Sequence, residues 1–399
     1  MKACDMEYNV EWSRLIQILT GKVPGGGSWT EDESVRLVQL AQSLGVASLL
    51  HVRLAQQSGF SLPAAANEAL RTAHLRSAMR NTRVYHYFGQ ILAELTRAEI
   101  PVVLLKGVGL ARFVYPNIAA RPMADIDILV AASHLERAVQ AVRLLGYQLN
   151  HPRAPGQPVR HHVHLEHEQA PPLEINGSSE FIDSTLPVSD AALAAIWART
   201  RPVVMNGLPA RLLSPEDELP YLCLHAAITH RFVMDLRPFV DIAALVARYP
   251  EGIDWAACRR HAKEWGAPDI FQLPLVLAAA WAGAAVPAEF LAAVPPHIRD
   301  ARLVEHVRRK VLRAPSENVW VDILPRTGTG SAEVEATVTT CASFNKHGLR
   351  IRSRDMRRNL SPPQLRAAAR LAWRWMRGEV ALRSSFRQER ILNRLVRGA

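Results

Sequence analysis

Residues 102–130 read VVLLKGVGLARFVYPNIAARPMADIDILV and contain two strand patterns. The first is a short apolar run that ends at Lys106-Gly107 and precedes a helical pattern, which predicts a buried strand that turns into a helix. In the second, acidic and apolar residues alternate from Asp125 to Val130, the period of a strand with one packed face. Asp125 and Asp127 are therefore predicted to point the same way.

Asp125 and Asp127 form a candidate cation site. Residues two apart on a strand lie about 6 to 7 Å apart at Cα, so both carboxylates could reach one divalent cation. Without a cation they would repel each other, and one would tend to protonate. The spacing alone fits solvated carboxylates at a strand end equally well, so the pair leaves both interpretations open.

The longer string of motifs resembles a known family. Leu-Leu-Lys-Gly at 104–107, Tyr115-Pro116 and the run from Arg121 to Val130 are similar to the uncharacterised nucleotidyltransferase family of the DNA polymerase β-like superfamily. Segments that look like the helical half of the family follow at 213–217, 222–227, 235–237, 241–243 and 253–255. The resemblance thus extends over residues 90–270.

Members of that superfamily carry a glycine turn that opens a helix, then a strand with two acids, then a third acid on a neighbouring strand. The candidate third acid is Glu174, in the alternating segment Leu173-Glu174-Ile175-Asn176. The resemblance implies that Asp125, Asp127 and Glu174 are catalytic and bind Mg²⁺ or Mn²⁺, with NTP as the substrate.

The resemblance also implies a nucleotide-binding set. Its members would neutralise phosphate charge, let the backbone approach the triphosphate, or reach the nucleotide from the helical half. They are Lys106, Gly107, Arg121, His225 and Arg237.

Two positions depart from the superfamily pattern. The turn usually carries Gly-Ser or Gly-Gly, whereas this chain has Lys106-Gly107-Val108-Gly109 and so lacks a hydroxyl for a phosphate. Asn176 stands where relatives often carry His. Neither change removes a predicted metal ligand.

The predicted architecture is α+β, with a small mixed-sheet nucleotidyltransferase core flanked by N-terminal and C-terminal helical regions. We divide the chain into an N-terminal helical region (1–95), the nucleotidyltransferase core (96–200), a helical domain (201–325) and a loop with a basic helical tail (326–399). Glu33 to Gln57 follows one helical pattern, and the apolar run from Leu275 to Val286 is too short to span a bilayer and predicts a buried helix.

Composition favours a reducing, cytoplasmic location. With 49% hydrophobic residues in 399, the chain can bury a large core. Its four cysteines match neither a disulfide framework nor a zinc spacing, and its first residues show no signal-peptide pattern. No transmembrane segment is expected.

The net charge of +11 is unevenly distributed. Residues 346–399 hold fifteen basic and three acidic residues, a charge of +12, which leaves −1 for residues 1–345. Arginines at three and four spacing from Arg366 to Arg397 predict basic helical stripes. These stripes could pack outward on the body of the protein, or attract an anionic acceptor, nucleic acid or membrane headgroups.

Histidine-based zinc sites are the competing chemistry. His162, His164 and Glu166 share one strand face, but residues spread along a strand do not converge on a tetrahedral ion. His225 and His230 would lie about 140° apart on an α-helix, which predicts different faces. Arg237 and Asp241, four residues apart, predict a local ion pair.

The predicted function is a metal-dependent transfer of a nucleoside monophosphate from NTP to a hydroxyl or phosphate of an unidentified acceptor, a small molecule or peptide, with release of pyrophosphate. Three alternatives stay open. The acceptor could be tRNA or another nucleic acid drawn by the arginine tail, the enzyme could modify a peptide or polysaccharide, or the chain could be a catalytically silent nucleotide-binding or scaffold protein.

Overall fold

The computed structural model describes residues 9–22, 29–57, 62–150, 162–177, 181–183, 186, 188–250 and 252–313. The predicted basic tail lies outside these residues. Within the described ranges, every helix is too short or too polar to cross a membrane.

The N-terminal region is helical, as predicted. It consists of α2 (Asn9–Leu19), α3 (Glu31–Ser43), α4 (Ala47–Ala55) and the long α5 (Ala64–Arg97). The pattern that predicted one helix from Glu33 to Gln57 is split at Gly45, which has a left-handed φ of 70°. A Cβ on Gly45 would come within 2.6 Å of the Asp235 carboxylate, so the close approach of another segment requires glycine there.

A seven-stranded mixed sheet forms the centre of the described structure, which confirms the α+β class. The strand order is β3-β4-β5-β2-β1-β7-β6, with parallel pairs β2–β5 and β1–β7 and antiparallel pairs elsewhere. The strands are β1 (Val103–Leu104), β2 (Ile126–Leu129), β3 (Gln148–Leu149), β4 (His162–Glu166), β5 (Leu173–Asn176), β6 (Arg201–Met205) and β7 (Leu208–Leu212). The hairpin β6–β7 continues the sheet beyond residue 200.

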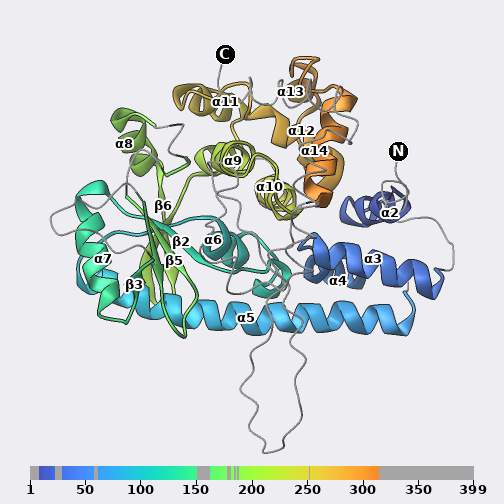
Figure 1. Ribbon diagram of the computed structural model, residues 1–399. Coiled ribbons are helices and arrows are strands. Elements are labelled where there is room, and N and C mark those ends of the chain that lie inside the picture. The colour runs from blue at the N-terminus through green and yellow to red at the C-terminus, as the bar shows by residue number, and fades with distance from the viewer. Residues whose placement is uncertain are drawn as a thin grey trace, which may run out of the picture. The chain divides into compact units, whose positions relative to one another are not determined.

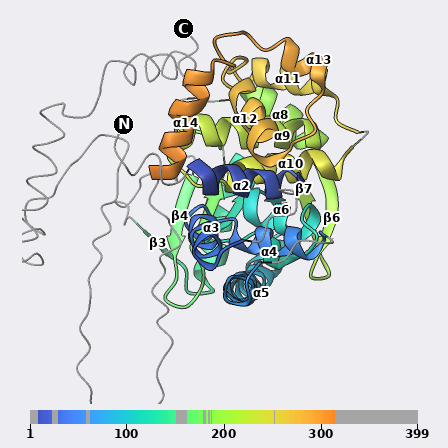
Figure 2. The same ribbon diagram turned by 90° about the vertical axis from the view of Figure 1, so that its right-hand side faces the viewer.

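The remaining helices follow or interrupt these strands (Figures 1 and 2). Those between the strands are α6 (Lys106–Phe113), η1 (Ile118–Ala120), η2 (Ala132–His134), α7 (Leu135–Arg143) and α8 (Asp190–Arg199). Those after the sheet are α9 (Pro215–Leu224), the π-helix η3 (His225–Thr229), α10 (Arg237–Arg248), α11 (Trp255–Glu264), α12 (Gln272–Ala282), α13 (Ala288–Ala292) and α14 (Ala301–Arg313).

Alternate residues of the strands divide between two cores. Ile126, Ile128 and Ile175 belong to a cluster that includes Phe88 of α5 and Val139 of α7. Figure 1 shows both helices beside this part of the sheet. The other face of β2 and β5 therefore carries Asp127 and Glu174.

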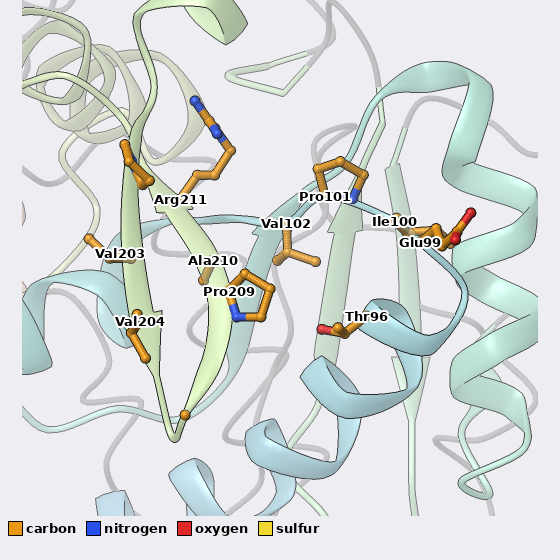
Figure 3. Close-up of a pocket in the computed structure, with 12 residues that line it drawn as sticks. Thr96, Glu99, Ile100, Pro101, Val102, Val203, Val204, Pro209, Ala210 and Arg211 are labelled. Carbon is orange, nitrogen blue, oxygen red and sulfur yellow. The ribbon is translucent and has the colours of Figure 1, made fainter.

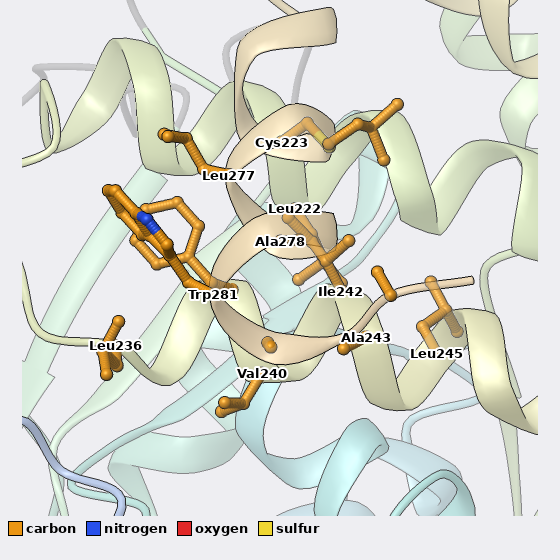
Figure 4. Packing of buried hydrophobic residues seen from close by; sticks show 14 of the residues in the cluster. Leu222, Cys223, Leu236, Val240, Ile242, Ala243, Leu245, Leu277, Ala278 and Trp281 are labelled. Carbon is orange, nitrogen blue, oxygen red and sulfur yellow. The ribbon is translucent and has the colours of Figure 1, made fainter. Parts of the chain in front are cut away.

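A second core fills the helical half. Leu222 of α9, Val240 and Ile242 of α10, and Ala278 and Trp281 of α12 are buried in one cluster (Figure 4). The apolar run at 275–286 lies mostly in α12, so the predicted buried helix is confirmed. Val103 and Leu129 of the sheet belong to the same cluster, which joins the helical half to the polar face of the sheet.

Candidate active site

Two of the predicted acids lie on adjacent strands at the same level. Asp127 of β2 is the cross-strand partner of Glu174 of β5, and Glu174 is in turn the partner of His164 of β4. Neighbouring strands lie about 4.8 Å apart, so the three side chains form one row across the polar face. Asp127 is only 3% exposed, whereas Asp125, just before β2, is exposed.

Lys106 connects this row to the helical half. Its Nζ lies 3.0 Å from Oδ1 of Asp127 and donates a hydrogen bond of 3.2 Å to Nε2 of His225. Because an ammonium group can only donate, His225 must accept through an unprotonated Nε2. Lys106 is the first residue of α6 and has a left-handed φ of 46°, an unusual conformation for a residue with a Cβ.

The acids are held in contrasting electrostatic environments. Burial raises the pKa of Asp127 to about 7, with Asp125 and Glu174 adding to the rise and Lys106 opposing it. Burial also acts to raise the pKa of Glu174, but Lys106 and His164 outweigh it and the net pKa is lowered. Asp127 is the more deeply buried of the two, so a proton shared by the pair would reside there.

His225 and His230 lie together, so the predicted separation of about 140° is wrong. The chain forms a π-turn at 225–229, in which the N–H of His230 bonds to the carbonyl of His225 at 3.2 Å. This i to i+5 spacing brings the two rings to a centroid distance of 4.6 Å. Burial lowers the pKa of His230 to about 4 and holds that of His225 well below its usual range, so both rings are neutral near pH 7.

Arg121 is held by a buried ion pair next to Gly107, at the start of α6. Its Nε and Nη2 donate to the two carboxylate oxygens of Asp241 at 3.1 and 2.8 Å, and Tyr115 donates its hydroxyl to the same carboxylate at 2.7 Å. Its Nη1 would lie 2.8 Å from a Cβ placed on Gly107. Glycine at 107 therefore allows α6 to begin against the guanidinium.

The predicted local pair of Arg237 with Asp241 is replaced by two others. Arg237 bonds to Asp235 at 2.8 Å, while Asp241 is occupied by Arg121. Spacing of i, i+4 allows a helical ion pair but does not compete with a bidentate partner that arrives from another segment. Arg237 nevertheless lies near enough to His230 to help lower the pKa of that ring.

The loop that leads into β2 is anchored to α5. Asn81 accepts a hydrogen bond from the N–H of Met123 at 3.1 Å and donates to the carbonyl of Arg121 at 2.8 Å. Ser77 donates to the carbonyl of Ala119 at 2.7 Å. The long helix thus fixes the backbone just before Asp125.

The donor chemistry of the row fits a hard divalent cation. Carboxylate oxygens are the ligands that Mg²⁺ prefers, and a cation would offset the burial of the Asp127 charge. Oδ1 of Asp127 is buried and faces the ammonium without a well-aligned hydrogen bond. In the part of the chain that the structure describes, no three His, Cys, Asp or Glu side chains are arranged as ligands of one ion.

Two neighbours of the row were not predicted. Tyr221 of α9 is buried, and its ring lies 6.0 Å from that of His225. Burial raises its pKa, with Lys106 opposing the rise and Asp127 adding to it. His230 reaches the row only through the π-turn. A local helical pattern contains no signal for that turn, because α and π geometry differ by a single residue per hydrogen bond.

A cavity of about 650 Å³ lies elsewhere (Figure 3). Its lining comes from the end of α5, the following loop, β6 and β7, and includes Glu99, Val102, Val204 and Arg211. None of the predicted site residues lines it. The candidate active site is therefore the row at β2, β5 and α6.

A protein-family model matches the part of the chain that contains these residues. The family model described as "Uncharacterised nucleotidyltransferase" matches residues 30–283, which include α6, β2, β5 and the π-turn. No curated protein is similar enough to match the chain.

Two solved structures are similar to parts of it. The antibiotic-resistance factor ANT(2″)-Ia aligns with 13% identity and a TM-score of 0.34, covering 46% of this chain and 91% of its own. An antigenic nucleotidyltransferase-like protein from Paracoccidioides brasiliensis aligns with 14% identity and a TM-score of 0.32, covering 54% of this chain and 97% of its own.

Proposed function

Since this chain belongs to the family of uncharacterised nucleotidyltransferases and is a nucleotidyltransferase, we propose that it uses a divalent cation to transfer NMP from NTP to an acceptor hydroxyl or phosphate. The observation that carries the proposal is the pairing of Asp127 with Glu174 across β2 and β5. Two carboxylates at one level, with Asp125 two residues before Asp127, would supply oxygen donors of the kind that Mg²⁺ or Mn²⁺ prefers.

The three acids would have different roles that depend on their exposure. Asp127, buried, and Asp125 would hold the cation, and Glu174 would complete its ligands. When bound, Mg²⁺ would neutralise charge on the triphosphate and on the leaving pyrophosphate. The Glu174 side chain is 24% exposed and lies beside His164, which is 55% exposed, so the acceptor would approach from this side of the row.

Glu174 is suited to assist the attacking group. Its lowered pKa keeps it ionised near neutral pH, so it can orient an acceptor hydroxyl and take its proton as the oxygen bonds to the α-phosphorus and pyrophosphate leaves. A neutral His225 would be available to hydrogen-bond the nucleotide.

Positive charge for the phosphates would come from three residues. Lys106 stands at the start of α6, and Arg121 lies beside Gly107, where the backbone N–H groups of the helix begin. Arg121 keeps Nη1 on the side of Gly107 while its other nitrogens bind Asp241. Arg237, near His230, would act at longer range.

The acceptor is proposed to be a small molecule or peptide in the cytoplasm. The first 345 residues carry a net charge of −1, which gives the catalytic part of the chain no general attraction for nucleic acid. An RNA acceptor would depend on the basic tail, and its binding would weaken steeply between low and moderate salt. A silent scaffold would have no need for three acids beside a buried lysine.

The decisive experiment incubates the protein with each α-labelled NTP, Mg²⁺ or Mn²⁺, and a host lysate separated into small-molecule, peptide and nucleic-acid fractions. We expect label to enter one fraction with one preferred NTP and to be lost with Asp127→Asn. Incorporation only into nucleic acid would favour the alternative acceptor. Failure to label any fraction, with NTP still bound, would favour the silent nucleotide-binding protein.

A further inference from the structure

Lys106 lies against the carboxylate of Asp127, which is proposed to hold the cation. Its Nζ lies 3.0 Å from Oδ1, and its side chain is only 15% exposed. Asp125 and Glu174 also attract its positive charge. The ammonium group thus serves as the counter-ion of the whole acidic row.

This arrangement is incompatible with a second cation on the same oxygen. An ammonium and a divalent ion that both approach Oδ1 of Asp127 would repel each other strongly in a buried site. We propose that Lys106 is a built-in competitor of the catalytic cation and leaves Asp127 when the cation and the nucleotide bind. This inference rests on the proposed function.

The structure provides partners for the released ammonium. His225 already accepts from Nζ at 3.2 Å, so the lysine has a second anchor that does not depend on Asp127. The triphosphate supplies the negative charge that the ammonium can follow. Lys106 is the first residue of α6, and its long side chain can move its ammonium group by a change of rotamer without a change in the backbone.

The consequence is that the cation and the nucleotide bind cooperatively. Without nucleotide, Lys106 weakens cation binding at Asp127. With nucleotide, the phosphates draw Lys106 away and the cation binds more tightly, so each ligand raises the affinity for the other by the same factor. The row would therefore remain neutralised by the protein itself until the metal–nucleotide complex arrives.

The test measures Mn²⁺ binding by electron paramagnetic resonance, without nucleotide and with an NTP analogue that has a methylene bridge between the α and β phosphorus atoms. For the wild-type protein we expect Mn²⁺ affinity to rise when the analogue is present. Lys106→Met removes the charge and keeps the apolar stem. We expect it to bind Mn²⁺ about tenfold more tightly without nucleotide, a change of about 1.4 kcal/mol, and to lose most of the enhancement by nucleotide.

Two matched controls isolate the local charge. Lys106→Arg keeps a cation at the site and should retain weak Mn²⁺ binding without nucleotide. Lys263→Met removes one positive charge from an exposed position on α11 and should behave like the wild type. Equal Mn²⁺ affinity for Lys106→Met and the wild type without nucleotide would overturn the inference.

The inference can fail separately from the proposed function. If Lys106→Met does not fold, Lys106→Gln replaces it as the uncharged variant, and equal Mn²⁺ affinity of the wild type with and without the analogue also overturns the inference. If instead Asp127→Asn binds Mn²⁺ as the wild type does in the presence of the analogue, the metal site lies elsewhere and the proposed function is wrong, whatever Lys106 does.

Discussion

The two faces of the central sheet come from alternate residues of the same strands, yet they form opposite kinds of interface. Ile126, Ile128 and Ile175 pack on α5 and α7 in an apolar cluster. One residue along each strand, Asp127 and Glu174 face the helical half, where charges are buried in pairs. The apolar face stabilises the fold, whereas the polar face holds buried charges that we propose serve the site.

Replacing the buried acid should give the largest effect. Asp127→Asn keeps the shape but removes the charge, so we expect transfer to fall by at least about a thousandfold. Asn also leaves the buried Lys106 ammonium without the charged partner that lies 3.0 Å away, so the free energy of unfolding without metal should fall. Transfer assays and urea denaturation measure the two quantities.

The exposed Asp269→Asn is the matched control and should change neither quantity. Unchanged transfer by Asp127→Asn would contradict the role proposed for the polar face.

Truncating a buried side chain on the apolar face should lower stability and leave nucleotide binding unchanged. Phe88→Ala removes a fully buried ring from α5 and should lower the free energy of unfolding by about 3 to 5 kcal/mol. The affinity of the folded protein for NTP should remain close to that of the wild type, as measured by calorimetry below the unfolding transition. Loss of nucleotide affinity in folded protein would show that the apolar face also shapes the site.

The buried pair of Arg121 and Asp241 tests whether charges on the polar side also support the fold. Asp241→Asn leaves the Arg121 guanidinium without its bidentate partner and should cost about 3 kcal/mol. The double replacement Arg121→Met with Asp241→Leu should recover much of that loss in thermal unfolding.

The double variant also isolates the second role proposed for Arg121. If its stability recovers but its NTP affinity drops, Arg121 contributes charge to the phosphates. Unchanged NTP affinity would remove Arg121 from the nucleotide-binding set.

Replacing Glu218 should have a smaller effect on stability, and this effect should depend on pH. Burial raises its pKa to about 8, Asp241 adds to the rise and Arg201 opposes it. The native state therefore binds a proton more tightly than the unfolded state, whose glutamates titrate near pH 4.3, and stability falls as pH rises from about 4 to 8. Glu218→Gln should stabilise the protein by about 2 kcal/mol at pH 6 and have little effect at pH 4.5. A pH-independent difference in urea denaturation would refute this origin.

Periodicity was sufficient to predict the side on which the acids lie. Alternation in 125–130 and in 173–176 places Asp127 and Glu174 off the apolar face, and the register of β2 with β5 then aligns them. The period does not determine which strands pair, so their adjacency came from the family resemblance. The domain boundaries remain a prediction, although the hairpin β6–β7 extends the sheet past residue 200.

The remaining features depend on contacts that local sequence does not contain. The helix is split at Gly45, where Asp235 leaves no room for a Cβ. Asp241 pairs with Arg121 across 120 residues in preference to Arg237 four residues away. The π-turn brings His230 beside His225 through one altered hydrogen bond. In each case the local sequence pattern allows two structures equally, and contacts with distant segments determine which one forms.

The most direct test of the central claim is calorimetric binding of the methylene-bridged NTP analogue with and without Mg²⁺ to the wild type, Asp127→Asn and Glu174→Gln. If the row on β2 and β5 holds the cation, Mg²⁺ should strengthen analogue binding to the wild type by about tenfold or more, a gain that Asp127→Asn loses and Glu174→Gln retains in part. Equal enhancement by Mg²⁺ in the wild type and in Asp127→Asn would contradict the claim.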